Sequence, residues 1–336
     1  MKLTYVLPLI ALLAIGCGSG DNKAPGSGTQ ADKPATPAAP FKVALITPGP
    51  VDDSGWNALA YDGLQAIKTD LGAEVNNQQA IGTQIKDTMR QYAQDGYNLV
   101  IGHGFEYNEP SIQVAKAFPN TVFVSSSGGK TAPNAGAFRF YLEQGFYLCG
   151  MMAGYMTKSG KVAMIGGDNV PSIVSTFHGF KAGFLAAKPN GQVIEVFTGN
   201  GEDVAAAKQA TLQAIANGAD FVIHQANAAA QGVFDACKEK GVYAFGANMD
   251  QNGNPSGIVI ASATIIAKPA FLDLAKRVKD HTYKGEVSLM GMDKGAIDFV
   301  VNPALANKVP ADVLKKLDQA KADIKSGKII VPMDKF

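Results

Sequence analysis

Polar and aromatic residues that could bind a small molecule follow several apolar runs of the sequence. The first group is Asp53, Trp56 and Asn57, which offer a carboxylate, the only tryptophan of the chain and an amide. An indole ring stacks on flat ligands, and carboxylate and amide groups orient such ligands through hydrogen bonds. The structural alternative is that Asp53 or Ser54 caps a helix and Trp56 packs beneath the cap. The complete set of candidate ligand-binding residues is Asp53, Trp56, Asn57, Phe105, Gln225, Asp250 and Lys268.

Together these residues suit a nucleoside better than an ion or a peptide. A flat ring could stack on Trp56, while Asp250 and Lys268 bind hydroxyl groups. His103 and His224 could instead hold a metal ion across a cleft, but we prefer to interpret them as ordinary loop histidines.

Motifs of catalysis are absent from the sequence. It contains no phosphate-binding G-x-x-x-x-G-K-[ST], no G-x-G-x-x-G after a strand, no G-x-S-x-G, no H-E-x-x-H and no C-x-x-C. Asp52 and Asp53 lack the longer aspartate-rich run that holds calcium in nucleoside hydrolases. We therefore expect no catalytic residue, no metal and no cofactor.

The elements that position the candidate residues alternate between strand and helix. An apolar run at 43–46 precedes a helical pattern from Trp56, and similar pairs follow to the end of the chain, where we predict a helix at 311–326 and a last strand at 329–331. Lys161–Ile165 repeats Lys42–Ile46 at an offset near 120 residues. This alternation and repeat predict an α/β protein with two Rossmann-like lobes, parallel sheets and a hinge of several segments.

The amino terminus has the pattern of a bacterial lipoprotein. Lys2 precedes an apolar run that ends in Leu13-Ala14-Ile15-Gly16-Cys17, similar to a lipobox. An ordinary signal peptide with an incidental cysteine is the alternative. We expect a lipidated Cys17 and a flexible tether over 18–40, which hold the protein at a bacterial membrane in the cell envelope, on a periplasmic or outer face.

The net charge bears on the expected partners of the protein, and the positions of the cysteines bear on its disulfides. The net charge is +1, and after residue 17 the chain balances 29 basic against 29 acidic residues, so nucleic acid is not an expected partner. The cysteines at 149 and 237 lie in helical patterns, where a buried free thiol is more usual than a disulfide.

With these features, the chain resembles the basic membrane protein family, the purine-nucleoside-receptor type of substrate-binding lipoprotein that serves ABC importers. The motifs run in family order over residues 41–280 and include VALITPGPVDDSGWNALAYDGL, FRFYLEQGFYLCGMMAGYMTKSGKVAMIGG and NGADFVIHQANAAAQGVFDACKEKGV. The resemblance implies two lobes of the periplasmic-binding-protein type I kind, over 41–143 (completed by part of 265–296) and 144–264 (completed by part of 297–336). It also implies that the lobes close on a nucleoside or related purine.

The resemblance assigns roles to single residues. Trp56 takes the place of the base-stacking phenylalanine of the family, Asn57 that of a base-edge contact, and Asp250 that of the ribose-binding acid. Phe105, Gln225 and Lys268 match further contact positions. The family often carries a second aromatic ring where this chain has Thr198–Asp203.

The sequence therefore predicts a monomeric receptor that binds a nucleoside-like solute, hands it to an ABC permease in the membrane and performs no chemistry. A ligand sensor that reports to a membrane signalling partner has the same expected fold and site. A secreted nucleoside-processing enzyme is a further alternative.

Overall fold

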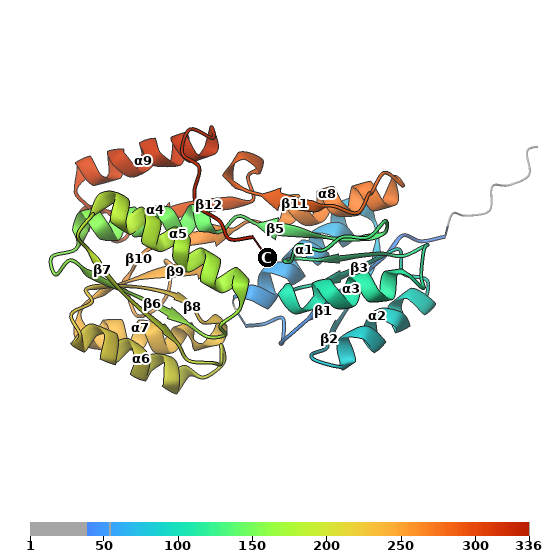
Figure 1. Ribbon diagram of the computed structural model, residues 1–336, viewed down its shortest axis with the longest axis horizontal. Helices are drawn as coiled ribbons and strands as arrows, with labels where there is room; N and C mark the ends of the chain where they lie inside the picture. Colours follow the sequence, from blue (N-terminus) through green and yellow to red (C-terminus); the bar gives the residue numbers. More distant parts are fainter. Residues whose placement is uncertain (1–38, 54, 336) are drawn as a thin grey trace, which may run out of the picture. The chain divides into compact units, whose positions relative to one another are not determined.

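The computed structural model describes residues 39–53 and 55–335. From Pro40 onward these residues form one compact unit in which helices and strands alternate (Figure 1). The predicted signal peptide with Cys17 and almost all of the predicted tether lie outside the described residues, as does Ser54. Within the described part, no helix combines the length and the apolar character needed to cross a membrane.

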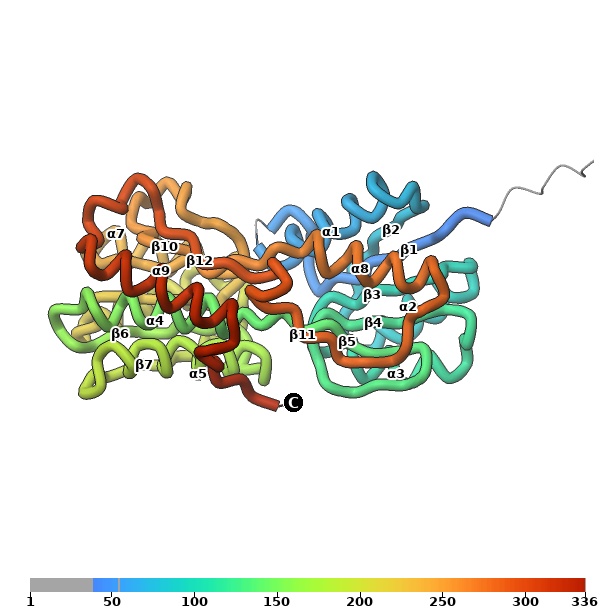
Figure 2. Tube along the Cα trace, turned by 90° about the horizontal axis from the view of Figure 1, so that it is seen from above, coloured from blue at the N-terminus to red at the C-terminus, as the bar shows by residue number. Residues whose placement is uncertain are grey.

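The first sheet, called sheet A, has the strand order β11-β5-β4-β3-β1-β2, and all its neighbouring pairs are parallel. Its strands are β1 (Lys42–Thr47), β2 (Glu74–Gln79), β3 (Leu99–Gly102), β4 (Val122–Ser125), β5 (Ala135–Phe140) and β11 (Val287–Met290). Its helices are α1 (Trp56–Leu71), α2 (Gln84–Gln94), α3 (Asn108–Ala115) and α8 (Ala267–Lys279). In Figure 2, α8 and β11, drawn in orange, lie beside the blue and green elements of this sheet, although they are far apart from them in sequence.

The second sheet, called sheet B, has the order β12-β10-β9-β8-β6-β7. Its pairs are parallel except that β12 runs antiparallel to β10. Its strands are β6 (Lys161–Gly166), β7 (Gln192–Phe197), β8 (Phe221–Gln225), β9 (Tyr243–Asn248), β10 (Val259–Ile265) and β12 (Ile297–Val301). Its helices are α4 (Glu143–Met156), α5 (Pro171–Ala187), α6 (Val204–Ala216), α7 (Ala230–Lys240) and α9 (Ala311–Lys325). The predicted α/β fold with two sheets dominated by parallel strands is therefore confirmed.

Three connections lead from one sheet to the other within the described residues. The chain leaves sheet A after β5, returns to it after β10 and leaves it again after β11. A hinge of several segments is typical of lobes that close as rigid bodies. The lobe boundaries given above stay a prediction, because the strand order does not locate them.

Close packing of α4 against α5 depends on small residues. A Cβ atom at Gly150 would overlap the carbonyl oxygen of Phe180, and one at Gly183 would overlap the carbonyl oxygen of Tyr147. The two glycines therefore let the helix backbones approach, and α4 is buried along most of its length. Its Cys149 is a free, fully buried thiol, as is Cys237 on α7, which confirms the prediction that both are unpaired.

The predicted strand at 329–331 is wrong. This segment is irregular: Val331 is 1% exposed and is buried without strand pairing, whereas Ile330 is 85% exposed. α3 begins at Asn108 because a 3-10 turn at Phe105–Tyr107 leads directly into it.

Candidate functional site

A cavity of about 720 Å³ opens where the carboxyl ends of strands from both sheets meet. Ligands of open α/β sheets bind at this edge of the strands. From the sheet A side, Trp56, Asn57 and Phe105 line the cavity, and Gln225 lines it from the sheet B side. Four of the seven predicted ligand-binding residues therefore lie around one cavity.

Trp56 is held by His103. Their rings stack with centroids 3.9 Å apart and an interplanar angle of 21°, and the edge of Phe140 approaches the indole at 6.5 Å. His103 Nε2 lies 2.7 Å from the Trp56 carbonyl oxygen, and its Nδ1 lies 2.7 Å from Ser126 Oγ. Because a carbonyl oxygen only accepts, Nε2 carries the proton and Nδ1 accepts from the Ser126 hydroxyl. Burial lowers the pKa of His103 to about 3, so the imidazole is neutral.

Asp53 positions the start of α1 and is not among the residues that line the cavity. Its carboxylate accepts hydrogen bonds of 3.0 Å from the backbone N–H groups of Gly55, Asn57 and Ala58. It also accepts from Asn57 Nδ2 at 2.8 Å. These contacts fix which way the Asn57 amide points, because only its nitrogen can donate to a carboxylate. Asp53 therefore binds the first N–H groups of α1, as the helix-cap alternative expects, although the N-cap position is Gly55 and Trp56 and Asn57 line the cavity.

Asn57 and Asn248 each bring a buried amide oxygen to the cavity wall. Asn57 is 1% and Asn248 5% exposed, and neither Oδ1 atom has a hydrogen-bond partner among the described residues. Asn248 ends β9 with a φ of +67°, a left-handed conformation that asparagine tolerates better than most residues. Its Nδ2 donates to Gln225 Oε1 at 3.1 Å. Buried polar atoms without partners and strained backbone both gather at binding sites.

A buried ion pair at the cavity wall was missed at the sequence level. Arg139 at the end of β5 and Glu143 in the first turn of α4 are 2.5 Å apart, with side chains 9% and 1% exposed, and both line the cavity. Burial raises the pKa of Glu143, and the Arg139 guanidinium opposes this rise. Two charged residues inside the apolar run FRFYLEQGF were the signal that could have revealed them.

The loop after β7 closes the cavity with polar residues. Asn200, Gly201 and Glu202, within the segment 198–203, line it. Glu202 Oε1 accepts from Asn227 Nδ2 at 2.5 Å, and Asn227 Oδ1 lies 3.4 Å from the backbone N–H of Trp56. Asn227 therefore links the sheet B loops to the start of α1.

Asp250 and Lys268 line a separate, smaller cavity of about 380 Å³. Lys268 Nζ pairs with Asp70 at 3.0 Å, and the Asp250 carboxylate accepts from the backbone N–H of Asn252 at 3.0 Å. Ile265 lines both cavities. The structure thus does not bring Asp250 and Lys268 into the cavity of Trp56, although the two cavities adjoin.

His224 does not contribute to a metal site in the described part of the chain. Its Nε2 lies 2.9 Å from Gln251 Oε1, and burial lowers its pKa to about 4. No group of three or more histidine, cysteine, aspartate or glutamate side chains among residues 39–53 and 55–335 is arranged to hold a metal.

Known proteins resemble this chain over most of its length. The family model described as ABC transporter substrate-binding protein PnrA-like matches residues 41–335. A purine-binding protein of Brucella abortus is 27% identical over 86% of this chain and 82% of its own length. Basic membrane protein A of Borreliella burgdorferi is 22% identical over 88% of each chain.

Solved structures agree with this assignment. An ABC transporter solute-binding protein from Conexibacter woesei is 26% identical, with a TM-score of 0.69 over 87% of this chain and 99% of its own. One from Aeropyrum pernix has a TM-score of 0.78 at 18% identity, over 88% and 94% of the two chains, and shows the shared fold. The resemblance found in the motifs is confirmed, and the family is one of solute-binding proteins. The chain belongs to the basic membrane protein family of PnrA-like ABC transporter substrate-binding proteins.

Proposed function

We propose that this protein binds a purine nucleoside or a related nucleobase compound in the cavity of Trp56 and delivers it to the permease of an ABC importer. The observation that carries the proposal is the half-buried indole, backed by His103 and set among buried amide and carboxylate groups on one cavity wall. This combination suits a flat, polar heterocycle. The purine-binding relative from Brucella abortus supports the same class of ligand.

The cavity has the size and charge for an uncharged compound. A volume of about 720 Å³ lies within the usual range for small-molecule sites. Its lining contains the acids Glu106, Glu143, Asp168 and Glu202 but only Arg139 as a base, and Arg139 is paired with Glu143. Because like charges repel, this lining disfavours a phosphate group, and we propose a nucleoside or base instead of a nucleotide.

The predicted residues contact different parts of the ligand. The base stacks on Trp56, and Asn57, Phe105 and Gln225 surround it. A ribose that extends past Ile265 reaches Asp250 and Lys268 in the adjoining cavity. Asp53 acts through Asn57, whose amide it orients.

Delivery to the permease requires that the two lobes open and close. The lobes would be 41–143 and 144–264, each completed by segments from the end of the chain, and Asn227 would fasten the closed form by its contact with the start of α1. A ligand that binds the closed form more tightly shifts the equilibrium towards it. Lipidation at Cys17 would keep this monomeric receptor at a membrane of the cell envelope.

The test is a thermal-shift panel on protein that has been unfolded and refolded to remove bound ligand. Nucleosides, free bases, nucleotides, sugars and amino acids are compared at equal concentration. A ligand that binds only the folded state raises the melting temperature once its concentration exceeds the dissociation constant. A shift with nucleosides or bases supports the proposal. A shift only with nucleotides, sugars or amino acids contradicts it.

A further inference from the structure

Glu143, one of the residues that line the cavity, holds a carboxylate oxygen that has no donor in the described part of the chain. Glu143 is 1% exposed, and its Oε2 atom has no hydrogen-bond partner among the described residues. Asn57 Oδ1, on the same cavity, is in the same condition. A buried acceptor without a donor is costly, and such atoms mark places where a ligand or a water completes the structure.

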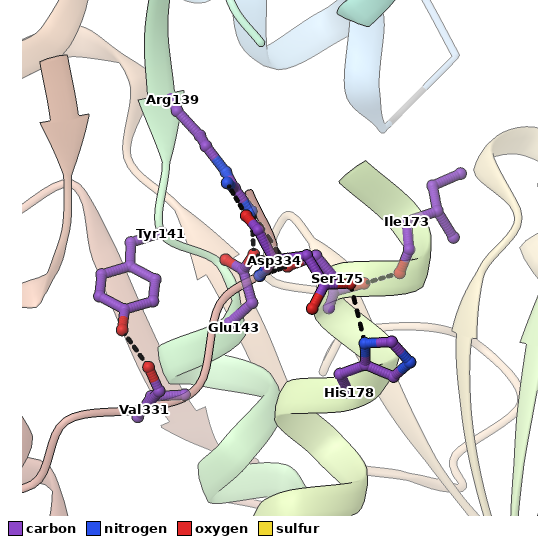
Figure 3. A network of polar contacts seen from close by, with 9 residues as sticks. Arg139, Tyr141, Glu143, Ile173, Ser175, His178, Val331 and Asp334 are labelled. Atoms are coloured by element: carbon purple, nitrogen blue, oxygen red, sulfur yellow. Dashed lines mark hydrogen bonds and ion pairs between the residues drawn. The ribbon is translucent and has the colours of Figure 1, made fainter. Parts of the chain in front are cut away.

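The other oxygen of Glu143 is fully engaged. Its Oε1 atom accepts from Arg139 Nη2 and from Ser175 Oγ, each at 2.5 Å (Figure 3). The two carboxylate oxygens are equivalent, so whichever of them accepts from Arg139 and Ser175, the other has no donor among the described residues. That second oxygen, Oε2 here, remains for a ligand.

The C-terminal segment holds Arg139 and Ser175 in place. Arg139 Nη1 donates to the carbonyl oxygen of Asp334 at 2.6 Å, and the Asp334 N–H donates to Ser175 Oγ at 2.9 Å. Figure 3 shows the segment of Val331 and Asp334 passing beside α5 at this network. Because Arg139 and Ser175 are held by backbone groups, the carboxylate between them is preorganised, which lowers the entropy lost when a ligand binds.

We infer that Glu143 is a specificity-determining residue whose free oxygen accepts a hydrogen bond from an exocyclic amino group of the bound base. An amino group projects from the ring and carries two N–H donors, and two residues that line the cavity, Glu143 and Asn57, each hold an unpaired acceptor, Oε2 and Oδ1. This inference rests on the proposed function, since it names the kind of nucleobase compound that the cavity prefers. The Arg139 guanidinium bonded to Glu143 favours its ionised form, and hydrogen bonds to an ionised carboxylate are stronger than neutral ones, so the amino group adds about ten- to a hundredfold in affinity.

Pairs of compounds that differ only by the amino group provide the test. Adenosine is compared with purine riboside, and guanosine with inosine, by isothermal titration of the refolded protein. The expected result is a tighter binding of the amino member, about ten- to a hundredfold, in at least one pair. If the protein binds these nucleosides but shows no preference in either pair, the role of Glu143 is refuted while the proposed function stands. If none of the nucleosides or their bases binds, the proposed function itself fails.

The substitution Glu143→Gln then distinguishes a role in recognising the ligand from a purely structural role. Since Arg139 and Ser175 both donate to the Oε1 position, the amide oxygen stays there and the amide nitrogen, a donor, replaces Oε2. The affinity ratio within the preferred pair should fall about tenfold or more, whereas a purely structural role changes both affinities equally and leaves the ratio intact.

Glu195→Gln is the matched control. It makes the same change of charge and shape at an exposed position of β7 outside the cavity. It should leave the ratio unchanged. If Glu143→Gln does not fold, the ratios of the wild-type protein decide the matter alone.

Discussion

Acidification to pH 5 should destabilise the protein through two buried histidines. His103 and His224 are 0% and 1% exposed, and burial lowers their pKa values to about 3 and about 4. Each is neutral in the folded state and hydrogen-bonded, His103 to Trp56 and Ser126, His224 to Gln251. A proton on either ring would place a charge inside the protein.

The sign and size follow from proton linkage. In the unfolded chain a histidine titrates near pH 6.5, so below that pH the unfolded state binds a proton that the folded state does not. The free energy of unfolding is therefore greatest above about pH 6.5 and falls as the pH falls towards the folded-state values. At pH 5 the loss is about 2 kcal/mol for each histidine and about 4 kcal/mol for both. This is a large part of the 5–15 kcal/mol that is typical of a folded protein.

Urea unfolding at pH 7, 6 and 5, followed by circular dichroism, measures this loss. His224→Gln removes one titrating group and should reduce the loss between pH 7 and 5 by about 2 kcal/mol. His281 is exposed and has a φ of +54°, so His281→Asn, which tolerates that conformation, is the control and should lose as much as the wild type. Glu106 and Glu143, whose pKa values burial raises, act in the opposite sense as the pH falls, but they do so in the wild type and in His224→Gln alike, so the difference between the two losses isolates His224. An unaltered loss in His224→Gln would show that the protons bind elsewhere.

Two further predictions concern the site and the C-terminal segment that contacts Arg139 and Ser175. Trp56→Ala should weaken binding of the preferred nucleoside by about 1–3 kcal/mol, the usual value of stacking a base on an aromatic ring, and unchanged affinity by calorimetry would exclude the stacking role. Asp334→Ala removes only the partly exposed contact with His178 and should cost less than about 1 kcal/mol of stability. Deleting residues 331–336 also removes buried Val331 and the backbone contacts with Arg139 and Ser175, so it should cost about 3 kcal/mol or more. Equal melting temperatures of the two tail variants would show that these backbone contacts stabilise nothing.

The central strands could be predicted from the sequence, and two edge strands could not. Val43–Ile46 is an uninterrupted apolar run because β1 lies inside sheet A, with helices on both faces. The strand β2 reads EVNNQQ and is largely exposed, since it has only one neighbour at the edge of the sheet. β11 is the opposite edge. Exposed edge strands carry polar residues, so the apolar pattern that identifies a strand is absent where they occur.

In the site, too, some features could be predicted from the sequence and others could not. The position of Trp56, Asn57, Phe105 and Gln225 on one cavity could be predicted because each follows or ends a strand, and the topology of a parallel sheet brings such positions together. Their role in ligand binding stays a prediction. Whether a particular carboxylate faces the ligand or its own helix depends on local geometry. The oxygens of Asp53 accept from backbone N–H groups at the start of α1, and Asp53 does not line the cavity.

The ion pair of Arg139 and Glu143 depends on contacts that no local pattern contains. The guanidinium is held by a carbonyl 195 residues later in the chain, and the carboxylate by a serine 32 residues later. Arg139 belongs to the last residues of β5 in sheet A, whereas Glu143 begins α4, which packs on sheet B, so the pair spans one of the connections between the sheets. Any rotation of the lobes about that connection must preserve the pair or separate two buried charges, and separating them would be costly. Because Glu143 also accepts from Ser175 on α5, this network joins elements of both sheets, and a motion that leaves it intact would bend the connections around it while the acceptor that we assign to the ligand stays in place.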